Sequence, residues 1–251
     1  MSKLFAALIA LIASIPLAPV TLPPAPADAC PPTWTYQKQS EWGGACEAGK
    51  MQSPVDVGPA VAKSTLTPIA FDYRAFPMSV MNTSRVFEVP HAARCSISAN
   101  HTRYNLQQFH FHFPSEHRVN GNAYDGELHL VHAGPDNRLA VVGIFIERGA
   151  ANATLAPIVN QAKSVAACRT SPVRGTIDPA ALAGGVHDYA TYSGSLTTPP
   201  CSETVTWYVM TTPIAASEDQ ITVLKSIGPN NRMPPLPLNG RALELFGQSP
   251  K

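Results

Sequence analysis

The sequence has few charged residues and no bias toward either sign. Only 14% of its 251 residues are charged, and 18 Lys and Arg residues against 17 Asp and Glu residues leave a formal net charge of +1. Nucleic-acid-binding domains carry a basic patch or stripe, and segments that bind anionic membrane surfaces carry clusters of Lys and Arg. Neither feature is present, so the composition argues against nucleic acid and a charged membrane surface as partners.

The chain also lacks internal repeats and linker-like tracts after its first residues. No self-similarity occurs at the periods of solenoids or propellers. No Pro-, Ser- or Gly-rich tract interrupts residues 30–251, which are enough for one domain with a large core.

A long apolar run occurs only at the N-terminus, where "LFAALIALIASIPLA" follows Lys3. It contains a proline and is shorter than the roughly 20 apolar residues of a membrane-spanning helix, so it predicts a signal peptide and no transmembrane segment. Cleavage fits after Ala29 in "PAPADA" or after Ala18, which would leave a Pro-rich spacer. Residues 1–29 are therefore interpreted as signal peptide and spacer, with a periplasmic or secreted location.

Cys30 directly follows this tract, as the modified cysteine of a lipoprotein would. However, Ala27 and Asp28 stand where a bacterial lipoprotein signal usually places a leucine and a small residue. The sequence thus argues against lipid anchoring at Cys30.

Short β-rich runs separated by Pro, Gly and Asn dominate the remainder. The clearest are residues 104–113, 126–133, 139–147 and 203–211. Helical patterns are few, and the best spans residues 154–167 with Thr154 as a candidate N-cap. We expect a mainly β (α+β) single domain with a large twisted, mostly antiparallel central sheet and peripheral helices.

The run "QFHFHFPSEH", residues 108–117, alternates polar and aromatic side chains. Since residues i and i+2 of a strand point to the same side, His110 and His112 share a face with Gln108, and the phenylalanines pack on the other face. An HxH pair alone is weak evidence for a metal, because such pairs also occur in cores.

The run "ELHLVH" supplies a candidate third ligand, because a catalytic zinc takes three protein ligands and keeps one open position. His129 shares its face with Glu127, and it can meet His110 and His112 if the two strands pair. Glu127 and Gln108 can then orient ligand histidines through hydrogen bonds.

These segments resemble the α-class carbonic anhydrases across nearly all of residues 30–251. The segments "QSPVD", "QFHFHFPSEH", "GELHLVH", "LAVVGIF", "YSGSLTTPPCSETVTW" and "PLNGR" stand in that family's order. The signal peptide suggests an exported, bacterial member.

The resemblance implies an enzyme, a carbonic anhydrase, that reversibly hydrates CO2 to bicarbonate and a proton by zinc-hydroxide attack. Zn2+ would be held by His110, His112 and His129, and its bound water would have a pKa near 7. Thr197 would accept a hydrogen bond from the hydroxide and donate one to Glu116. The family also implies inhibition by anions and sulfonamides and a possible side activity on esters.

Further residues acquire roles only through the resemblance. The CO2 pocket would be lined by Val131, Val141, Leu196, Thr198, Val205 and Trp207. His117 matches a buried structural histidine of the family.

The proton-shuttle position, a histidine in fast members, falls on Arg85. Arginine stays protonated in proteins and cannot relay a proton. Glu88 and His91 are the alternatives near the mouth of the site, and an ordinary glutamate would be a poor proton acceptor from a group with a pKa near 7.

Five cysteines remain in a chain expected to reach an oxidising compartment. Cys46 and Cys201 match a pair that is bridged in many extracellular members, and such a bridge would brace the loop carrying Thr197. Cys95 and Cys168 have no counterpart in the family.

Three other functions remain open at this point. A family-like binding module without catalysis would typically lack one zinc histidine, whereas all three are kept here. A zinc hydrolase acting on esters would use the same residues, and a periplasmic metal-binding protein would need neither Thr197 nor an apolar pocket.

Overall fold

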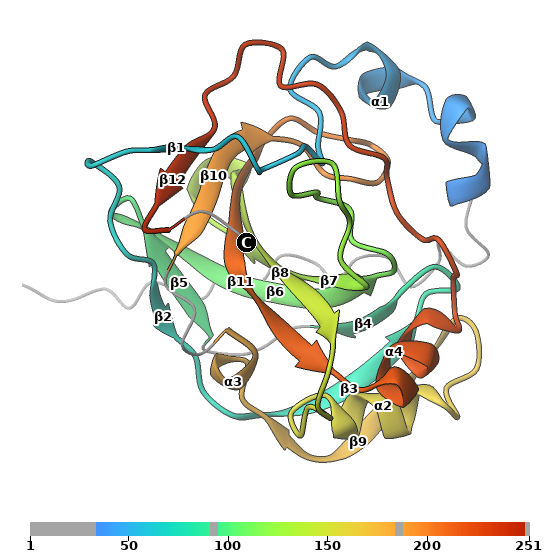
Figure 1. Cartoon of the computed structure of the whole chain (residues 1–251). Helices are drawn as coiled ribbons and strands as arrows, with labels where there is room; N and C mark the ends of the chain where they lie inside the picture. The colour runs from blue at the N-terminus through green and yellow to red at the C-terminus, as the bar shows by residue number, and fades with distance from the viewer. Residues whose placement is uncertain (1–33, 91–94, 184–187, 249–251) are drawn as a thin grey trace, which may run out of the picture.

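The computed structural model describes residues 34–90, 95–183 and 188–248 (Figure 1). The expected signal peptide and spacer, Cys30 and His91 lie outside these residues. The helices are η1 (Tyr36–Glu41), α1 (Gly44–Ala48), η2 (Pro135–Asn137), α2 (Ala156–Ala162), α3 (Ala180–Ala183) and α4 (Glu218–Lys225). The strands are β1 (Val61–Ala62), β2 (Ala70–Asp72), β3 (Phe76–Asn82), β4 (Phe87–Pro90), β5 (Ser96–Ala99), β6 (Thr102–His112), β7 (Gly126–Ala133), β8 (Leu139–Arg148), β9 (Arg169–Ile177), β10 (Tyr189–Gly194), β11 (Val205–Ala216) and β12 (Glu244–Phe246).

One twelve-stranded sheet runs through the molecule in the order β1-β12-β10-β11-β8-β7-β6-β4-β3-β9, and β5 pairs with β2 and β6 outside this path. Most neighbours are antiparallel, but β8 pairs with β11 and β1 pairs with β12 in parallel. The expected mainly β fold with a large, mostly antiparallel sheet and few helices is confirmed.

The four strands expected from alternation are present with small shifts. Residues 126–133 form β7 as predicted, whereas β11 extends beyond its expected end to Ala216. The β6–β7 pair is antiparallel, which is the pairing that the histidine pattern required.

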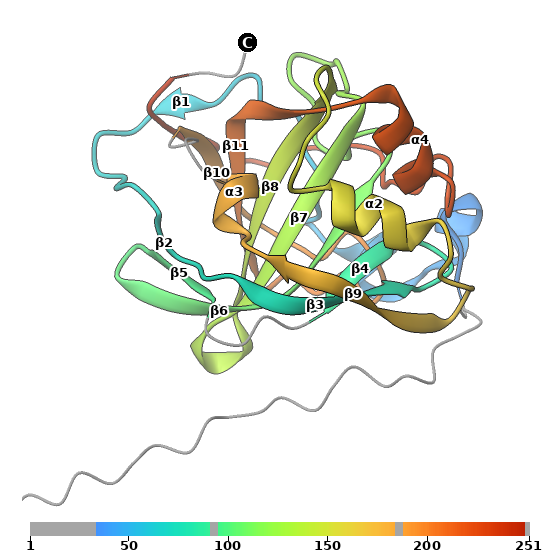
Figure 2. The same ribbon diagram turned by 90° about the horizontal axis from the view of Figure 1, so that it is seen from below.

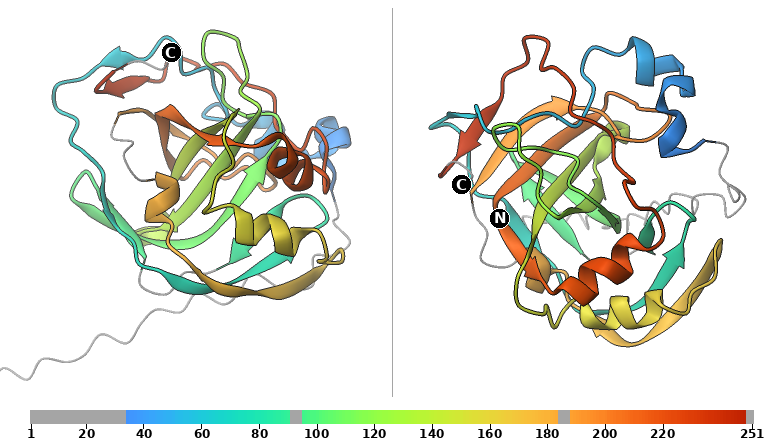
Figure 3. Two further views of the ribbon diagram at one scale, coloured as in Figure 1. Left: turned by 60° about the horizontal axis from the view of Figure 1, so that its bottom comes forward. Right: turned by 45° about the vertical axis from the view of Figure 1, so that its right-hand side comes forward.

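Alternate residues of the central strands serve two separate clusters. One face carries Phe109, Phe111, Leu128 and Leu130 into the main core, where all four are buried. Helices α2, α3 and α4 cover this core on one side of the sheet (Figures 1 and 2). The other face carries the histidines and a smaller apolar cluster, and the N-terminal segment with α1 lies on that side (Figure 3).

The expected helix after residue 154 exists but is shorter and capped differently. It spans Ala156–Ala162, and Thr154 is not its N-cap. Instead, the side-chain oxygen of Asn152 accepts hydrogen bonds from the backbone N–H groups of Thr154 and Leu155, at 3.0 and 3.3 Å. Asn152 thus fixes the turn that leads into the helix, whose N-cap position is occupied by Leu155 without a side-chain hydrogen bond.

Among the described residues, no helix is long and apolar enough to cross a membrane.

Candidate metal centre

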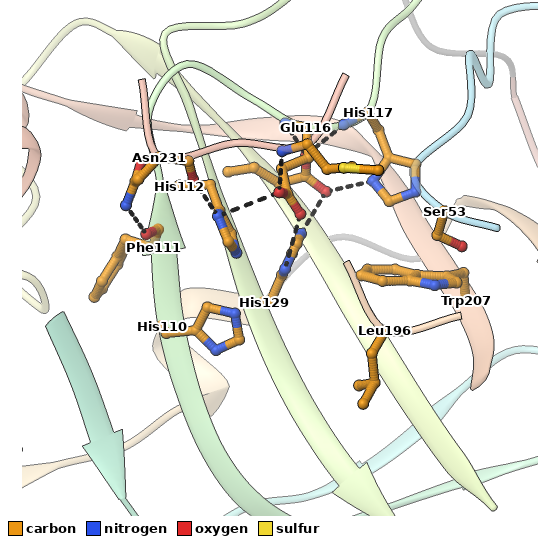
Figure 4. A network of polar contacts seen from close by, with 12 residues as sticks. Ser53, His110, Phe111, His112, Glu116, His117, His129, Leu196, Trp207 and Asn231 are labelled. Carbon is orange, nitrogen blue, oxygen red and sulfur yellow. Dashed lines mark hydrogen bonds and ion pairs between the residues drawn. The ribbon is translucent and has the colours of Figure 1, made fainter. Parts of the chain in front are cut away.

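Two neighbouring strands place three histidine rings around one point (Figure 4). His110 on β6 pairs with His129 on β7, and His112 follows two residues later on the same face. One ring nitrogen of each histidine lies within 4.8 Å of the other two. The structure thus brings together the three residues that the sequence pattern singled out.

The partners of the three rings fix which nitrogens carry protons. Nδ1 of His110 lies 2.7 Å from the Gln108 side-chain oxygen, and Nδ1 of His112 lies 2.7 Å from the Asn231 backbone carbonyl. Nε2 of His129 lies 2.9 Å from Glu127 Oε1. Because these oxygens accept hydrogen bonds, each contacting nitrogen must be the protonated one.

The opposite nitrogen of each ring is therefore left with a free lone pair. Nε2 of His112 is buried and has no hydrogen-bond partner among the described residues. Three neutral imidazoles with bare nitrogens form the donor set of a catalytic zinc, which keeps a fourth position for water or substrate. The residues present fit Zn2+.

Burial keeps the three rings neutral. Burial and, to a smaller extent, the neighbouring His129 together lower the pKa of His112 to about 3. Burial likewise lowers the pKa of His110 well below its usual value and lowers that of His129. Because the neutral imidazole is the form that binds a metal, these shifts preserve the ligands well into the acidic range.

Glu127 fixes the orientation of His129, and both oxygens of its carboxylate accept hydrogen bonds. Its Oε1 also accepts from Nδ1 of His117 at 2.7 Å, and its Oε2 accepts from the backbone N–H groups of Glu116 and His117, both at 2.9 Å. Burial alone would raise the pKa of Glu127, but the two histidines and these hydrogen bonds hold the pKa well below its usual value. Glu127 is therefore ionised at neutral pH.

His117 supports the metal centre indirectly, through its hydrogen bond to Glu127. It is fully buried, and its Nε2 lies 2.7 Å from the Tyr192 hydroxyl, which contacts Ser53 Oγ at 2.9 Å. His117, Glu127 and His129 also lie close enough to suggest a second metal group. However, the contacting atoms of that group are already joined by hydrogen bonds, so His117 acts as a support rather than as a ligand.

Gly143 on β8 leaves space for the Glu127 carboxylate. It pairs with His129 across the β7–β8 ladder, and a Cβ atom at this position would lie 2.8 Å from Glu127 Oε1.

We expect Gly143→Ala to displace the Glu127 carboxylate and to weaken zinc affinity by roughly 10- to 100-fold, as loss of a hydrogen-bond partner of a metal ligand does. Chelator competition measures this change. Gly149→Ala, at an exposed glycine just after β8, is the control, and equal zinc affinity in both variants would contradict the role given to Gly143.

Glu116 and Thr197 meet beside the histidines. Glu116 is fully buried, its Oε1 accepts the Met233 N–H at 2.7 Å, and its Oε2 lies 3.9 Å from Nδ1 of His129. Burial raises the pKa of Glu116 well above its usual value, while Thr197, as a side-chain hydrogen-bond partner, and the Met233 N–H lower it. Among the described residues, Oε2 of Glu116 has no closed hydrogen bond, and Thr197 supplies the hydroxyl that lies beside this carboxylate.

The residues matched to a CO2 pocket lie next to the His129 ring. Val131 and Trp207 each pair with Val141 on β8, and the Trp207 ring lies 4.8 Å from that of His129. Val205 and Leu196 belong to the same apolar cluster, and Thr198 is half-buried. Val141, Val205 and Trp207 are almost completely covered, whereas Val131 and Leu196 keep exposed surface. Figure 4 shows Leu196 and Trp207 on the His129 side of the centre.

Arg85 lies in the turn before β4, and its side chain packs on an aromatic ring. Its guanidinium carbon is 3.9 Å from the centroid of the Trp34 ring. Its backbone carbonyl accepts from the side chain of Asn231 at 2.9 Å, and the Asn231 carbonyl in turn holds His112. Burial lowers the pKa of Arg85, but a guanidinium remains cationic in proteins.

Glu88 differs from the ordinary glutamate that the sequence suggested. It pairs with His110 across the β4–β6 ladder, and burial raises its pKa to about 7. Its pKa in the metal-free protein therefore lies in the range of a physiological proton acceptor.

A disulfide and a carboxylate fasten the loop that follows Thr197. Cys46 and Cys201 are bonded, with Cα atoms 5.0 Å apart. The Gln52 side-chain amide donates to the Cys201 carbonyl at 3.1 Å and to Glu203 at 2.8 Å. The loop is thus held to the N-terminal part of the domain by one covalent and two polar contacts.

His132 points away from the metal centre, because residues three apart on a strand face opposite sides of the sheet. It is fully buried, its Nε2 lies 2.7 Å from the Tyr73 hydroxyl, and its Nδ1 lies 3.2 Å from the Ala140 carbonyl. Burial lowers the pKa of His132 to about 4, whereas an unfolded chain takes up this proton near pH 6.5. The unfolded state therefore binds more protons between these values, and the free energy of unfolding falls as the pH falls.

We expect this single group to cost the metal-free protein on the order of 3 kcal/mol between about pH 6.5 and 4. Denaturant unfolding at several pH values measures the slope. His132→Gln should flatten the slope by up to about one proton, whatever its effect at neutral pH. An unchanged slope in the variant would show that His132 is not held neutral.

Several site residues carried no signal in the sequence. Asn231 and Tyr192 contact His112 and His117 from distant parts of the chain. Ser53 contacts Tyr192, and Met233 contributes only its backbone N–H, which binds Glu116. "QSPVD" contained Ser53, but only the fold shows that its hydroxyl reaches Tyr192.

Comparison with known proteins gives a consistent picture. The model of the eukaryotic-type carbonic anhydrase family matches residues 33–246. A carbonic anhydrase from Nostoc sp. is 39% identical over 200 residues, covering 78% of this chain and 76% of the relative. Dioscorin DioA3 from Dioscorea japonica is 32% identical over 226 residues, covering 87% and 83%.

The solved structures agree with the sequence relatives. The α-carbonic anhydrase from Thermovibrio ammonificans, solved with the inhibitor sulfanilamide, superposes with a TM-score of 0.75 at 35% identity, covering 80% of this chain and 89% of that one. The chain therefore belongs, as an enzyme, to the eukaryotic-type, α-class carbonic anhydrase family.

Proposed function

We propose that this protein catalyses the reversible hydration of CO2 to bicarbonate and a proton, with Zn2+ held by His110, His112 and His129. The observation that supports this most strongly is the set of three bare ring nitrogens, each oriented by a partner on its other nitrogen. When bound, Zn2+ supplies a hydroxide nucleophile at neutral pH by lowering the pKa of water to about 7.

Thr197 and Glu116 would fix the direction of attack. This role requires an ionised Glu116, and a nearby Zn2+ would favour the carboxylate against the effect of burial. An ionised carboxylate only accepts hydrogen bonds, so a Thr197 hydroxyl that donates to Glu116 can only accept a hydrogen bond from the attacking oxygen. Because the attacking oxygen must donate its proton to Thr197, one of its lone pairs is left to face the substrate carbon. Met233 N–H holds the other oxygen of Glu116, which keeps the carboxylate from rotating.

The apolar surface beside His129 would hold CO2. The substrate has no charge to bind, so it gains most from replacing water on the exposed parts of Val131 and Leu196. Trp207 packs in the same apolar cluster and is almost completely buried, so it supports the shape of this surface.

The activity is tested by stopped-flow CO2 hydration on pure, zinc-loaded protein, with ester hydrolysis measured on the same sample. We expect fast hydration and weaker turnover of activated esters, both lost on chelation and restored by zinc. Ester turnover without CO2 hydration would indicate a hydrolase. Stoichiometric zinc without either activity would indicate a metal-binding protein, and absence of both zinc and activity would indicate a binding module.

The relative solved with sulfanilamide suggests how the site would be inhibited. We expect sulfonamides and small anions to block CO2 hydration here, because both bring a negatively charged or acidic group to the zinc. A sulfonamide titration that leaves activity unchanged would contradict this.

The proposed location is the periplasm or the cell exterior, with residues 1–29 as signal peptide and spacer and residues 30–251 as the exported domain. Support comes from the sequence of residues 1–29 and from the Cys46–Cys201 disulfide, which persists in oxidising compartments. The intact mass of the exported protein identifies the cleavage site.

Proton release should limit turnover, because Arg85 stands at the shuttle position. Without a relay, a diffusion limit of about 10^10 per molar per second multiplied by an acid constant of roughly 10^-7 molar caps turnover near 10^3 per second. We expect turnover to rise steeply with buffer concentration. Arg85→His should raise it at low buffer by roughly tenfold or more, since a positioned histidine is an efficient proton-transfer group near neutral pH.

Arg85→Lys, which keeps the charge and adds no relay, is the matched control. High turnover at low buffer, with no gain from Arg85→His or added imidazole, would show that another group carries the proton. Glu88→Gln then identifies that group: a large loss of turnover at low buffer would assign the role to Glu88.

A further inference from the structure

Asp56 holds a turn of the loop that carries Glu116 between β6 and β7. Its Oδ1 accepts hydrogen bonds from the backbone N–H groups of Gly58 and Asn120, both at 2.9 Å. Its Oδ2 accepts a further hydrogen bond from the Gly121 N–H. One carboxylate, far from this loop in the sequence, therefore binds three backbone donors.

The turn itself leaves two of these donors without a partner. Asn120 and Gly121 have φ values of 52° and 84°, the pattern of a type I′ turn, for which Asn-Gly is a preferred pair. Val119 and Asn122 close the turn with two backbone hydrogen bonds of 2.9 and 3.0 Å. These bonds do not use the N–H groups of the two central residues, so Asp56 supplies the acceptor that they need.

The backbone around Asp56 also pairs with the loop just after His117. The Val57 N–H donates to the Arg118 carbonyl at 2.8 Å, and the Arg118 N–H donates to the Val55 carbonyl at 3.4 Å. These contacts form an isolated parallel bridge between Asp56 and Arg118. The loop is thus tied to residues 55–57 on one side and to the Asp56 carboxylate at its turn.

The same stretch of chain, residues 52–58, also holds the segment that leads to Thr197. The Ser53 N–H donates to Ser195 Oγ, and the Ser195 N–H donates to Ser53 Oγ, both at 3.0 Å. Ser195 lies two residues before Thr197. The segments that carry Thr197 and Glu116 are therefore both fastened to residues 52–58.

We propose that Asp56 is a positioning residue, which keeps Glu116 aligned with Thr197 by fixing the Asn-Gly turn against residues 52–58. Asp56 acts through the loop and is not itself a catalytic residue. The inference rests on the proposed function, because the alignment of this pair matters only for the direction of the attacking oxygen.

A loose turn would be felt at Glu116 because the loop is short and its other contacts are few. The N–H groups of Glu116 and His117 both bind Glu127 Oε2 at 2.9 Å. A shift of the loop would strain these bonds and move the Glu116 carboxylate relative to the Thr197 hydroxyl. A misplacement of about 1 Å at a reacting centre can lower a rate by roughly 100-fold.

A double-mutant cycle on zinc-loaded protein tests the coupling between Asp56 and Thr197. Asp56→Asn turns an N–H2 group toward a backbone N–H of the turn, and it should lower kcat/KM for CO2 hydration by roughly tenfold at unchanged zinc content. In the Thr197→Val background, where Glu116 no longer orients the attacking oxygen, the same substitution should have less than about a twofold effect.

The cycle separates positioning from a general loss of stability. Equal fold losses in both backgrounds would show that Asp56 only stabilises the fold, and would overturn the proposal. A wild-type protein without CO2 hydration would instead overturn the proposed function.

Hydrogen exchange of the zinc-loaded protein gives a readout that does not depend on activity. Asp56→Asn should speed exchange at the amides of the Asn-Gly turn and of Glu116 by roughly tenfold. Asp178→Asn is the matched control, because Asp178 also accepts a backbone N–H, that of Ala180 at 3.0 Å. The control should leave these amides and kcat/KM unchanged. Faster exchange in the turn alone, with Glu116 as in wild type, would overturn the proposal.

Gly58→Ala disturbs the same turn without changing the carboxylate. A Cβ atom at this position would lie 2.2 Å from Oδ1 and 2.5 Å from the backbone N of Asn120, so the turn must move. The variant should show the same coupling to Thr197→Val, and it replaces Asp56→Asn if that protein does not fold. Full kcat/KM in a folded Gly58→Ala protein would overturn the proposal.

Discussion

Replacing His129 by Ala should remove zinc and CO2 hydration together. Wild-type protein should hold about one zinc per chain, because a catalytic zinc needs three protein ligands. The variant keeps only His110 and His112, so its zinc content should fall toward zero and its CO2 hydration to the uncatalysed rate. Elemental analysis and stopped-flow measurement on the same sample follow both quantities.

The loss must be distinguished from unfolding, because Glu127 loses one hydrogen-bond partner in this variant. Leaving a buried group less well paired costs about 1–3 kcal/mol, which the Tm of the metal-free proteins will show. His101→Asn, at an exposed histidine with positive φ, is the matched control and should behave as wild type. A folded His129→Ala protein that keeps stoichiometric zinc and activity would refute the ligand assignment.

Thr197→Val should lower kcat/KM for CO2 hydration by roughly 10²- to 10³-fold while zinc stays bound. The variant keeps the shape of the side chain but removes the hydroxyl that joins Glu116 to the attacking oxygen. Loss of one preorganised hydrogen-bonding group at a reacting oxygen typically has an effect of this size. Stopped-flow kinetics and zinc content provide the two readouts.

Thr197→Ser keeps the hydroxyl and should recover most of the activity. Zinc content should be equal in wild type and both variants, since Thr197 is not a ligand. If Thr197→Val retained full activity, the nucleophile would not be oriented through Glu116.

The local part of the site could be predicted from the sequence because strand periodicity encodes it. Alternation places His110 and His112 on one face, and the structure pairs His110 with His129 as that interpretation required. The same rule puts Phe109 and Phe111 into the core and turns His132 away from the centre.

The supporting contacts could not be predicted, because they join segments far apart in the chain. Asn231 reaches His112 across 119 residues, and Tyr192 reaches His117 across 75. Such contacts depend on the parallel and antiparallel neighbours of the whole sheet, and no local period encodes that order. The N-cap expected at Thr154 was wrong because the helix begins one residue later, with Leu155 at the N-cap position.

The measurement that tests the central proposal most directly is a zinc titration of the metal-free protein followed by CO2 hydration. We expect activity to be absent without zinc, to rise in proportion to added zinc, and to stop rising at one equivalent per chain. The His129→Ala protein should show no rise over the same range. CO2 hydration that persists in the zinc-free wild type, or that rises equally in the variant, would contradict the proposal that these three histidines hold a catalytic zinc.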